Sequence, residues 1–362
     1  ASLGGAHGAR RPPSCGVSER RTGLPRFARN RAGPDTPARM FLDQTTLFIL
    51  LAALVIDAAV GEPAWLWRRF PHPVVVIGRI IDWLDRALND PRLAEASRRR
   101  RGIIAIAALV MGALVIGSLV QGALALLPFG WLLTAAVASV LIAQRSLYEH
   151  VVPVRDALAA GDLARARKAV SMIVGRDPAR LDAPGIARAA IESTAENASD
   201  GVVTPAFWFA VLGLPGLLAY KVINTADSMI GHRSPRHLAF GWAAARLDDL
   251  VNLVPARLSG VLFALAAPVV GGRIGAAFAV MRRDAGLHRS PNAGWPEAAA
   301  AGALGVALAG PRFYASGPVD DPFLNPEGRR DPGAHDVARA LRLFVAKCAL
   351  LAAFCAVLSL IA

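Results

Sequence analysis

The chain has 362 residues, of which 54% are apolar and 19% are charged, and it carries a net charge of +13. Soluble globular domains are about 45–50% apolar and about 25% charged, so this composition is typical of a membrane protein. Three cysteines exclude a disulfide scaffold, glycines without a period exclude a collagen, and the apolar fraction excludes a wholly disordered chain.

The first segment, residues 1–39, is basic and has no apolar periodicity. Eight arginines and two acids give it a net charge of +6, and no uninterrupted apolar stretch of a secretory signal precedes Met40. We expect it to be disordered. No nucleic-acid reader module accompanies it, so we do not expect a nucleic-acid partner.

The position of the basic residues bears on where the functional chain starts. Nine arginines follow the first apolar run, residues 45–60, which argues that this second basic flank is cytoplasmic. A basic leader before the same run would conflict with that orientation. We therefore expect the functional chain to begin at Met40, so that residues 1–39 form a dispensable leader and residues 40–362 the membrane domain.

Apolar runs of spanning length organise the rest of the chain. Residues 103–143 predict a helical hairpin that turns at Pro128, and residues 343–362 predict a final span. Residues 202–220 are apolar but are broken around Pro215, which leaves a span and a re-entrant helix both open. Residues 255–270 and 298–309 are shorter apolar runs. The expected fold is all-α, a polytopic integral membrane protein with four to six membrane-embedded helices, and residues 144–201 form a soluble helical insert on the cytoplasmic side.

Polar residues in this apolar background gather in a few clusters. The first contains Asp57, near the end of an apolar run, and His72 between two prolines. An ionisable residue within a span is costly and is by default a functional candidate, although an interfacial Asp that ends the span fits equally well. A lone His is more often structural.

The second cluster places three carboxylates at helical spacing. Glu192, Glu196 and Asp200 lie at i, i+4 and i+8, and no Lys or Arg lies between Arg188 and Lys221 to compensate them. Like charges at this spacing repel each other, so the pattern favours a divalent cation or a cationic partner at this face over a purely solvated one.

Two further clusters follow on apolar helices. Asn224 and Asp227 share a helical face, and Asp248 and Asn252 are one helical turn apart, so each pair is expected to point in one direction. We expect the second, third and fourth clusters together to line a polar catalytic cavity. A fifth stretch, residues 282–297, combines arginines with a proline-framed turn, and arginines recognise phosphate or carboxylate groups unless they only set topology.

Five long strings resemble the cobinamide-phosphate synthase family (CobD/CbiB) of cobalamin biosynthesis. They are D-A-A-V-G-E-P with P-H-P-V-V-V-I-G-R at 57–79, E-S-T-A-E-N-A-S-D-G-V-V-T-P at 192–205, Y-K-V-I-N-T-A-D-S-M-I-G-H at 220–232, A-A-R-L-D-D-L-V-N-L-V-P-A-R at 244–257 and S-P-N-A-G-W-P-E at 290–297. They occur in the expected order, and the resemblance covers residues 40–362.

The resemblance implies an amide-forming ligase. ATP would activate a carboxylate of adenosylcobyric acid, and the amine of aminopropanol or of its O-phosphate would attack it. It also implies Mg²⁺ and ATP at the site, a corrinoid bound as substrate, a multi-pass position in the cell (inner or plasma) membrane, and contact with the lipid bilayer and with other cobalamin-assembly enzymes.

Residue roles within this resemblance follow from side-chain chemistry. The catalytic candidates are Glu192, Glu196, Asp200, Asp227 and Asp248, and the metal candidates are Glu192, Glu196, Asp248 and Asp249. The substrate-binding candidates are Asp57, His72, Arg79, Asn197, Lys221, Asn224, His232, Arg233, Asn252, Arg283, Arg289, Asn292 and Trp295.

Two other functions fit some of the same residues. Asp248, Asp249 and Asn252, with Asn224 and Asp227, form the paired polar pattern with which an integral membrane prenyltransferase or phosphotransferase binds Mg²⁺-diphosphate. A transporter could use Asp57 and the broken segment near Pro215 as an ion path. The residues alone leave all three functions open, and the five strings favour the ligase.

Overall fold

The computed structural model describes residues 43–174, 178–232, 234–314, 317–319 and 321–361. Residues 1–42 lie outside the described residues. The expected disorder of the leader and the expected start at Met40 therefore stay predictions.

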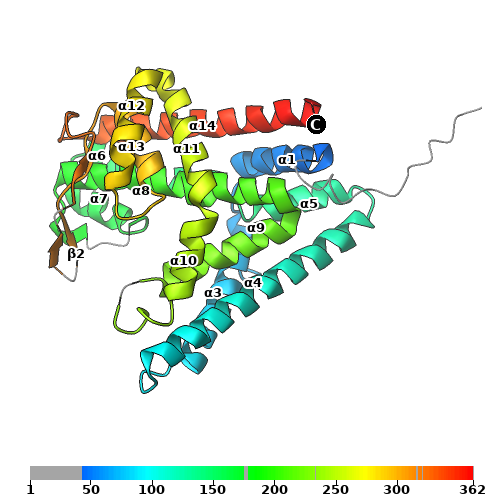
Figure 1. Cartoon of the computed structure of the whole chain (residues 1–362). Helices are drawn as coiled ribbons and strands as arrows, with labels where there is room; N and C mark the ends of the chain where they lie inside the picture. The colour runs from blue at the N-terminus through cyan, green and yellow to red at the C-terminus, as the bar shows by residue number, and fades with distance from the viewer. Residues whose placement is uncertain (1–42, 175–177, 233, 315–316, 320, 362) are drawn as a thin grey trace, which may run out of the picture. The chain divides into compact units, whose positions relative to one another are not determined.

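The described chain is built from helices and two very short antiparallel strand pairs (Figure 1). The first seven α-helices are α1 (Gln44–Val60), α2 (Ala64–Trp67), α3 (Pro73–Leu88), α4 (Glu95–Ala125), α5 (Gly130–Ser139), α6 (Gln144–Ala159) and α7 (Leu163–Val170). The next seven are α8 (Ala183–Ala198), α9 (Thr204–Ile230), α10 (Trp242–Val251), α11 (Leu253–Ala266), α12 (Ile274–Asp284), α13 (Gly294–Leu304) and α14 (Ala334–Ile361). A π-helix, Ser199–Val203, joins α8 to α9, and 3-10 turns lie at Pro178–Arg180, Ala267–Val270 and Ala285–Leu287. Strand β1 (Leu308–Ala309) pairs with β4 (Phe323–Leu324), and β2 (Arg312–Tyr314) pairs with β3 (Gly317–Val319).

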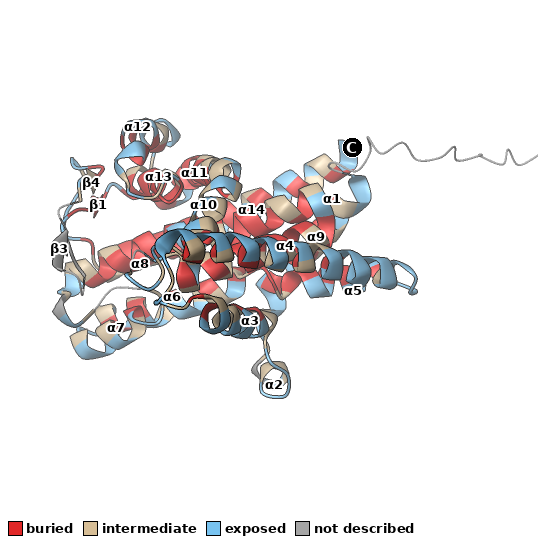
Figure 2. Ribbon diagram, turned by 60° about the horizontal axis from the view of Figure 1, so that its bottom comes forward, coloured by how far each residue is buried: buried red, intermediate tan, exposed pale blue. Residues whose placement is uncertain are grey.

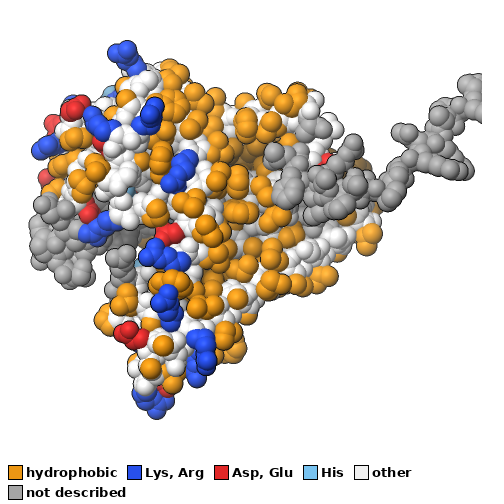
Figure 3. All heavy atoms as spheres, viewed as in Figure 1, with side chains coloured by type: hydrophobic (Ala, Val, Ile, Leu, Met, Phe, Trp, Pro, Cys, Tyr) orange, Lys and Arg blue, Asp and Glu red, His pale blue; other side chains and the backbone are white. Residues whose placement is uncertain are grey.

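The prediction of an all-α polytopic membrane protein is confirmed. Among the described residues, five helical segments are long and apolar enough to cross a membrane: 95–125, 130–159, 183–230, 253–270 and 334–361. The shorter apolar helix α1 accompanies them. In the view of Figure 3, orange apolar side chains cover most of the described surface, while Lys and Arg gather toward the lower tip and the left end. Such a broad apolar surface fits burial in lipid.

The predicted hairpin is confirmed, since α4 and α5 pack together on either side of Pro128. The predicted break in the next apolar segment is also present, because Gly213 has φ 67° and ψ −152° inside α9. Gln121 of α4 compensates the break: its side-chain oxygen accepts a hydrogen bond of 2.8 Å from the Leu214 N–H. Backbone irregularities at membrane depth require such partners. The span and the re-entrant helix both stay predictions for this segment.

The final helix starts nine residues earlier than the apolar run predicts, at Ala334. Polar contacts hold its first turn, where Asp336 accepts hydrogen bonds from the Gly333 N–H and from Arg329. Asp336 is only 3% exposed, so hydrophobicity alone could not reveal that this turn is part of the buried helix.

The main core surrounds α8, which is buried along most of its length, whereas α4 is exposed along much of its length (Figure 2). Helix α8 packs against α6, α7, α13 and α14. The helical content predicted for residues 144–201 is confirmed by α6, α7 and α8. Its assignment to a soluble insert stays a prediction.

A polar clamp ties α3 and α4 to the loop after α9. Asp85 accepts hydrogen bonds from Asn89 at 2.7 Å and from Arg236 at 2.6 and 2.9 Å. Asn89 in turn accepts from Arg98 at 2.8 Å, and both Asn89 and Arg98 donate to the Arg236 carbonyl. Burial raises the pKa of Asp85, but the hydrogen bonds and charge of its partners outweigh burial and hold the pKa below its usual value of 3.8.

We expect Asp85→Asn to lower the stability of the folded protein by about 1–3 kcal/mol at pH 7. Because the folded pKa of Asp85 is depressed, its contribution is complete above the unfolded value of 3.8 and is lost as the pH falls through the lower folded value. Thermal unfolding in detergent should therefore show a gap between wild type and variant that is constant from pH 5 to 8 and closes below pH 4. A gap that persisted in acid would show that the charge of Asp85 does not stabilise the fold.

Candidate functional site

The second, third and fourth polar clusters meet where the π-helix, α9, α10 and α11 pack together. Asp200 lies in the π-helix, Lys221 and Asp227 lie on α9, and Asp248 lies on α10. Asp200 interacts electrostatically with Asp248, Asp227 and Lys221. The side chains of these clusters therefore lie close together, and the catalytic cavity expected from them stays a prediction.

The π-helix presents Asp200 to this site. The backbone carbonyl of Asp200 accepts a hydrogen bond of 2.9 Å from the Tyr220 hydroxyl, and Tyr220 is only 1% exposed. π-helical turns are rare and often occur at functional sites. Here the turn changes the helical register after Ala198, so Asp200 does not follow the α-helical face that carries Glu192 and Glu196.

Asp248 is held by two asparagine side chains. Its two carboxylate oxygens accept hydrogen bonds from Asn252 at 3.0 Å and from Asn224 at 3.5 Å. Burial, followed by the charge of Asp227, raises the pKa of Asp248 to about 7, although both hydrogen bonds lower it. A carboxyl group with such a pKa can accept or release a proton near neutral pH.

The first cluster borders the same site through Glu62, which interacts electrostatically with Lys221 and His72. His72 also caps α3, since its Nδ1 accepts from the Val74 N–H at 3.2 Å. Burial lowers the pKa of His72, which favours the neutral ring that this cap requires. The structure thus gives His72 a structural contact and a position near Lys221.

Asp57 joins the end of α1 to the start of α6. It is 2% exposed and accepts a hydrogen bond of 2.7 Å from the Gln144 N–H, while the Gln144 side chain donates to the Leu54 carbonyl at 2.9 Å. These contacts favour the structural interpretation of Asp57. Arg79 is exposed on α3.

Two carboxylates of the second cluster have different surroundings. Glu192 is 5% exposed, and its carboxylate accepts a hydrogen bond of 2.7 Å from the Ala309 N–H in β1. Glu196 is exposed and interacts electrostatically with Asp200. The predicted face of three carboxylates is therefore divided: Glu196 and Asp200 belong to the site, and Glu192 holds β1 against α8.

Asn197 faces a neighbouring space. It donates hydrogen bonds to the Ser193 hydroxyl and carbonyl at 3.0 and 2.9 Å, and with Gly201 and His150 it lines a cavity of about 370 Å³. The cavity adjoins the π-helix and has the dimensions of a small-ligand site.

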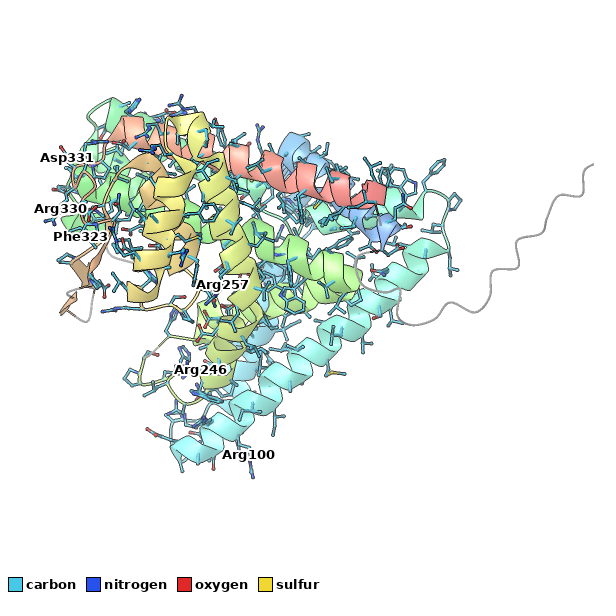
Figure 4. The ribbon with its side chains drawn as sticks, turned by 45° about the horizontal axis from the view of Figure 1, so that its top comes forward. Arg100, Arg246, Arg257, Phe323, Arg330 and Asp331 are labelled. Atoms are coloured by element: carbon cyan, nitrogen blue, oxygen red, sulfur yellow. The ribbon has the colours of Figure 1, made fainter. Side chains whose placement is uncertain are left out.

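The fifth stretch contacts the site through Asn292 and Trp295. Asn292 donates to the Asp249 carbonyl at 2.8 Å and accepts from Arg257 at 3.1 Å. The Arg257 guanidinium also lies 4.5 Å from the centre of the Trp295 ring. Figure 4 labels Arg257 on α11 and, below it in that view, Arg246 on α10.

The arginines of the fifth stretch have acidic partners. Arg283 binds both carboxylate oxygens of Asp284, at 2.7 and 2.9 Å, and also Glu327 at 3.2 Å. Arg289 binds Asp321 at 2.7 Å. These ion pairs would have to open before either arginine could bind phosphate, so their phosphate role stays a prediction. His232 is exposed and interacts with Asp227, and Arg233 lies outside the described residues.

Magnesium binding was predicted at Glu192, Glu196, Asp248 and Asp249. Among the described residues, no three His, Cys, Asp or Glu side chains are grouped closely enough to hold a metal ion by themselves. Mg²⁺ commonly uses one or two carboxylates and completes its shell with water and substrate phosphates, and the oxygen donors around Asp248 fit that mode. The metal assignment stays a prediction.

Sequence reasoning did not single out Tyr220 or Lys347. Lys347 lies in the last spanning helix with 0% exposure, and its ammonium donates to the Ala198 carbonyl at 2.5 Å. A lone charge inside an apolar run is by default a functional candidate, and that signal was present in the sequence. Tyr220 gave no such signal because its partner is a backbone carbonyl distant in sequence.

Comparison with known proteins identifies the family. The family described as CobD/CbiB protein matches residues 50–344. Cobalamin biosynthesis protein CobD from Sinorhizobium sp is 51% identical over 88% of this chain and all of its own length. The proteins of the same name from Rhizobium meliloti and Rhodobacter capsulatus are 52% and 51% identical, over 84% and 82% of this chain and 94% and 92% of their own lengths. No solved structure matches. The chain belongs to the CobD/CbiB family of cobalamin biosynthesis proteins.

Proposed function

We propose that the protein is an adenosylcobinamide-phosphate synthase, which forms an amide between adenosylcobyric acid and aminopropanol or its O-phosphate at the expense of ATP. The observation that carries the proposal is the partly buried cluster of Asp200, Asp227 and Asp248 with Lys221, together with family membership. The same proposal places the protein in the cell membrane, with corrinoid and cobalamin-assembly enzymes as its partners.

The chemistry requires activation of a poor electrophile. The corrinoid carboxylate takes the terminal phosphoryl group of ATP, which gives an acyl phosphate and ADP. The amine nitrogen then attacks the acyl carbon, the C–N bond forms, the C–O bond to phosphate breaks, and inorganic phosphate leaves. Amine attack requires the neutral amine, so one proton must leave the ammonium group.

The residues of the site suit these steps. Asp248, whose pKa is raised to about 7, accepts the proton, and Asp200 and Asp227 attract the incoming ammonium group. Lys221 binds a phosphate oxygen, and Asn224 and Asn252 hold Asp248 in place. Mg²⁺ bound by one or both of Glu196 and Asp249 would neutralise the phosphates of ATP, which leaves Asp248 as the proton acceptor.

The test is incubation of purified protein with adenosylcobyric acid, Mg-ATP and either aminopropanol or aminopropanol phosphate. We expect the corrinoid to gain the mass of the amine minus one water, with one ATP consumed per amide. If the corrinoid stayed unchanged with both amines while a control enzyme was active, the proposal would be contradicted. The prenyltransferase or phosphotransferase and the transporter would then be the functions to test.

We expect Glu196→Gln to abolish amide formation while membrane insertion stays normal. Glu196 is exposed beside Asp200, so its charge is not needed for packing but contributes to the acidic site. Activity and the yield of membrane-extracted protein measure the two effects separately. Full activity of this variant would show that Glu196 is a solvated surface residue with no role in the reaction.

A further inference from the structure

Lys347, a buried lysine of the last spanning helix α14, lies close to Asp200 of the candidate site. Lys347 is near the middle of α14, among the buried side chains of Phe344, Cys348 and Leu351. Its exposure is 0%. Placing an amine in such surroundings is costly unless it makes specific contacts. The buried amine of Lys347 is therefore expected to make such contacts.

The contacts of Lys347 reach two other elements. Its Nζ donates a hydrogen bond of 2.5 Å to the carbonyl oxygen of Ala198, and it lies 4.6 Å from the centre of the Phe263 ring on α11. Its side chain also interacts electrostatically with Asp200. The amine therefore connects α14 with α11 and with the end of α8.

Ala198 is the last residue of α8, and the π-helix begins at Ser199. The regular i to i−4 hydrogen bonding of an α-helix is interrupted at such a junction, so a carbonyl there benefits from another donor. On the other side of the junction, the Tyr220 hydroxyl donates to the Asp200 carbonyl. Lys347 and Tyr220 thus hold the carbonyls on both sides of Ser199.

We propose that Lys347 is a positioning residue that fixes the π-helix, and with it the direction of the Asp200 carboxylate, through its hydrogen bond to the Ala198 carbonyl. The inference rests on the proposed function, because it assigns Lys347 to the same site. It differs from a general packing role, since it requires that loss of the amine acts on the reaction through Asp200.

Hydrogen exchange tests the geometry without the use of activity. In Lys347→Met, which keeps the length of the side chain but removes the donor, we expect the amides of residues 199–204 to exchange about tenfold faster than in wild type. Cys348→Ala is the matched control, because it alters the adjacent buried position and leaves the donor in place. Equal protection of residues 199–204 in wild type and Lys347→Met would overturn the proposal.

A double-mutant cycle tests the link to Asp200. Misplacement of a reacting group by about 1 Å can cost about 10²-fold in rate, so Lys347→Met should lower kcat by that factor and leave KM for the corrinoid unchanged. In an Asp200→Asn background, Lys347→Met should lower kcat by less than about threefold, because the carboxylate that Lys347 positions is already absent. Lys347→Gln, whose amide can still donate a hydrogen bond, should have a kcat at least about tenfold higher than that of Lys347→Met.

The outcomes separate the two proposals. A wild-type protein that makes no amide contradicts the proposed function, and hydrogen exchange then still decides whether Lys347 fixes the π-helix. An active wild type in which the effects of Lys347→Met and Asp200→Asn multiply independently would overturn the positioning role while leaving the proposed function intact.

Discussion

Replacing Asp248 with Asn is expected to lower kcat for amide formation by about 10³-fold, within the range that positioned acid–base groups contribute. The substitution keeps the size of the side chain, and Asn224 and Asn252 can reorient toward an amide oxygen. It removes the group that accepts the proton of the ammonium, so KM for the corrinoid should change little. Initial rates of corrinoid amide formation at saturating ATP measure the effect.

The control for this variant is Asp156→Asn. Asp156 is an exposed carboxylate of α6 that pairs with Arg155, and its loss should leave the rate within about twofold of wild type, as is usual for surface ion pairs. If Asp248→Asn kept more than a tenth of the wild-type rate, Asp248 would not be the proton acceptor. A neighbouring group would then have to accept the proton.

Replacing Gly117 with Leu is expected to prevent normal packing of α4 on α9. A Cβ at Gly117 would lie 2.6 Å from the Pro215 Cα and 2.8 Å from the Pro215 nitrogen, and backbone atoms cannot move aside as a side chain can. Overpacking typically costs about 1–3 kcal/mol, and here the helices themselves must separate. We expect most of this variant to aggregate on extraction in mild detergent, with the remainder unfolding at a lower temperature.

Gly122→Leu is the matched control on the same helix. A Cβ at Gly122 meets no atom within 4 Å, so the variant should extract and unfold like wild type. If Gly117→Leu behaved in the same way, the close contact between α4 and the break in α9 would not be present in the protein in its membrane.

Local signals in the sequence predicted the parts of the fold that depend on local properties. Apolar length and Pro128 predicted the α4–α5 hairpin, and the Gly-Leu-Pro-Gly segment at residues 213–216 predicted the break in α9. Helical spacing correctly paired Asp248 with Asn252, because one α-helical turn separates them and the helix between them is regular.

The remaining features depend on contacts that are distant in sequence. Regular spacing placed Glu192 with Asp200, but the π-helix after Ala198 changes the register, and Glu192 binds the Ala309 N–H instead. Likewise, helical or loop patterning could not show that Arg289 pairs with Asp321. Sequence therefore located the polar clusters, whereas tertiary packing decided which of their members face one another.

The most direct test of the central claim is the corrinoid mass spectrum after incubation with Mg-ATP and ¹⁵N-labelled aminopropanol phosphate. The account predicts a corrinoid that carries the label in an amide with wild type and with Asp156→Asn, and almost none with Asp248→Asn. Labelled amide formed equally by all three proteins would contradict the assignment of the chemistry to the Asp200, Asp227 and Asp248 cluster. Absence of labelled corrinoid with wild type, both with this amine and with ¹⁵N-labelled aminopropanol, would contradict the proposed reaction itself.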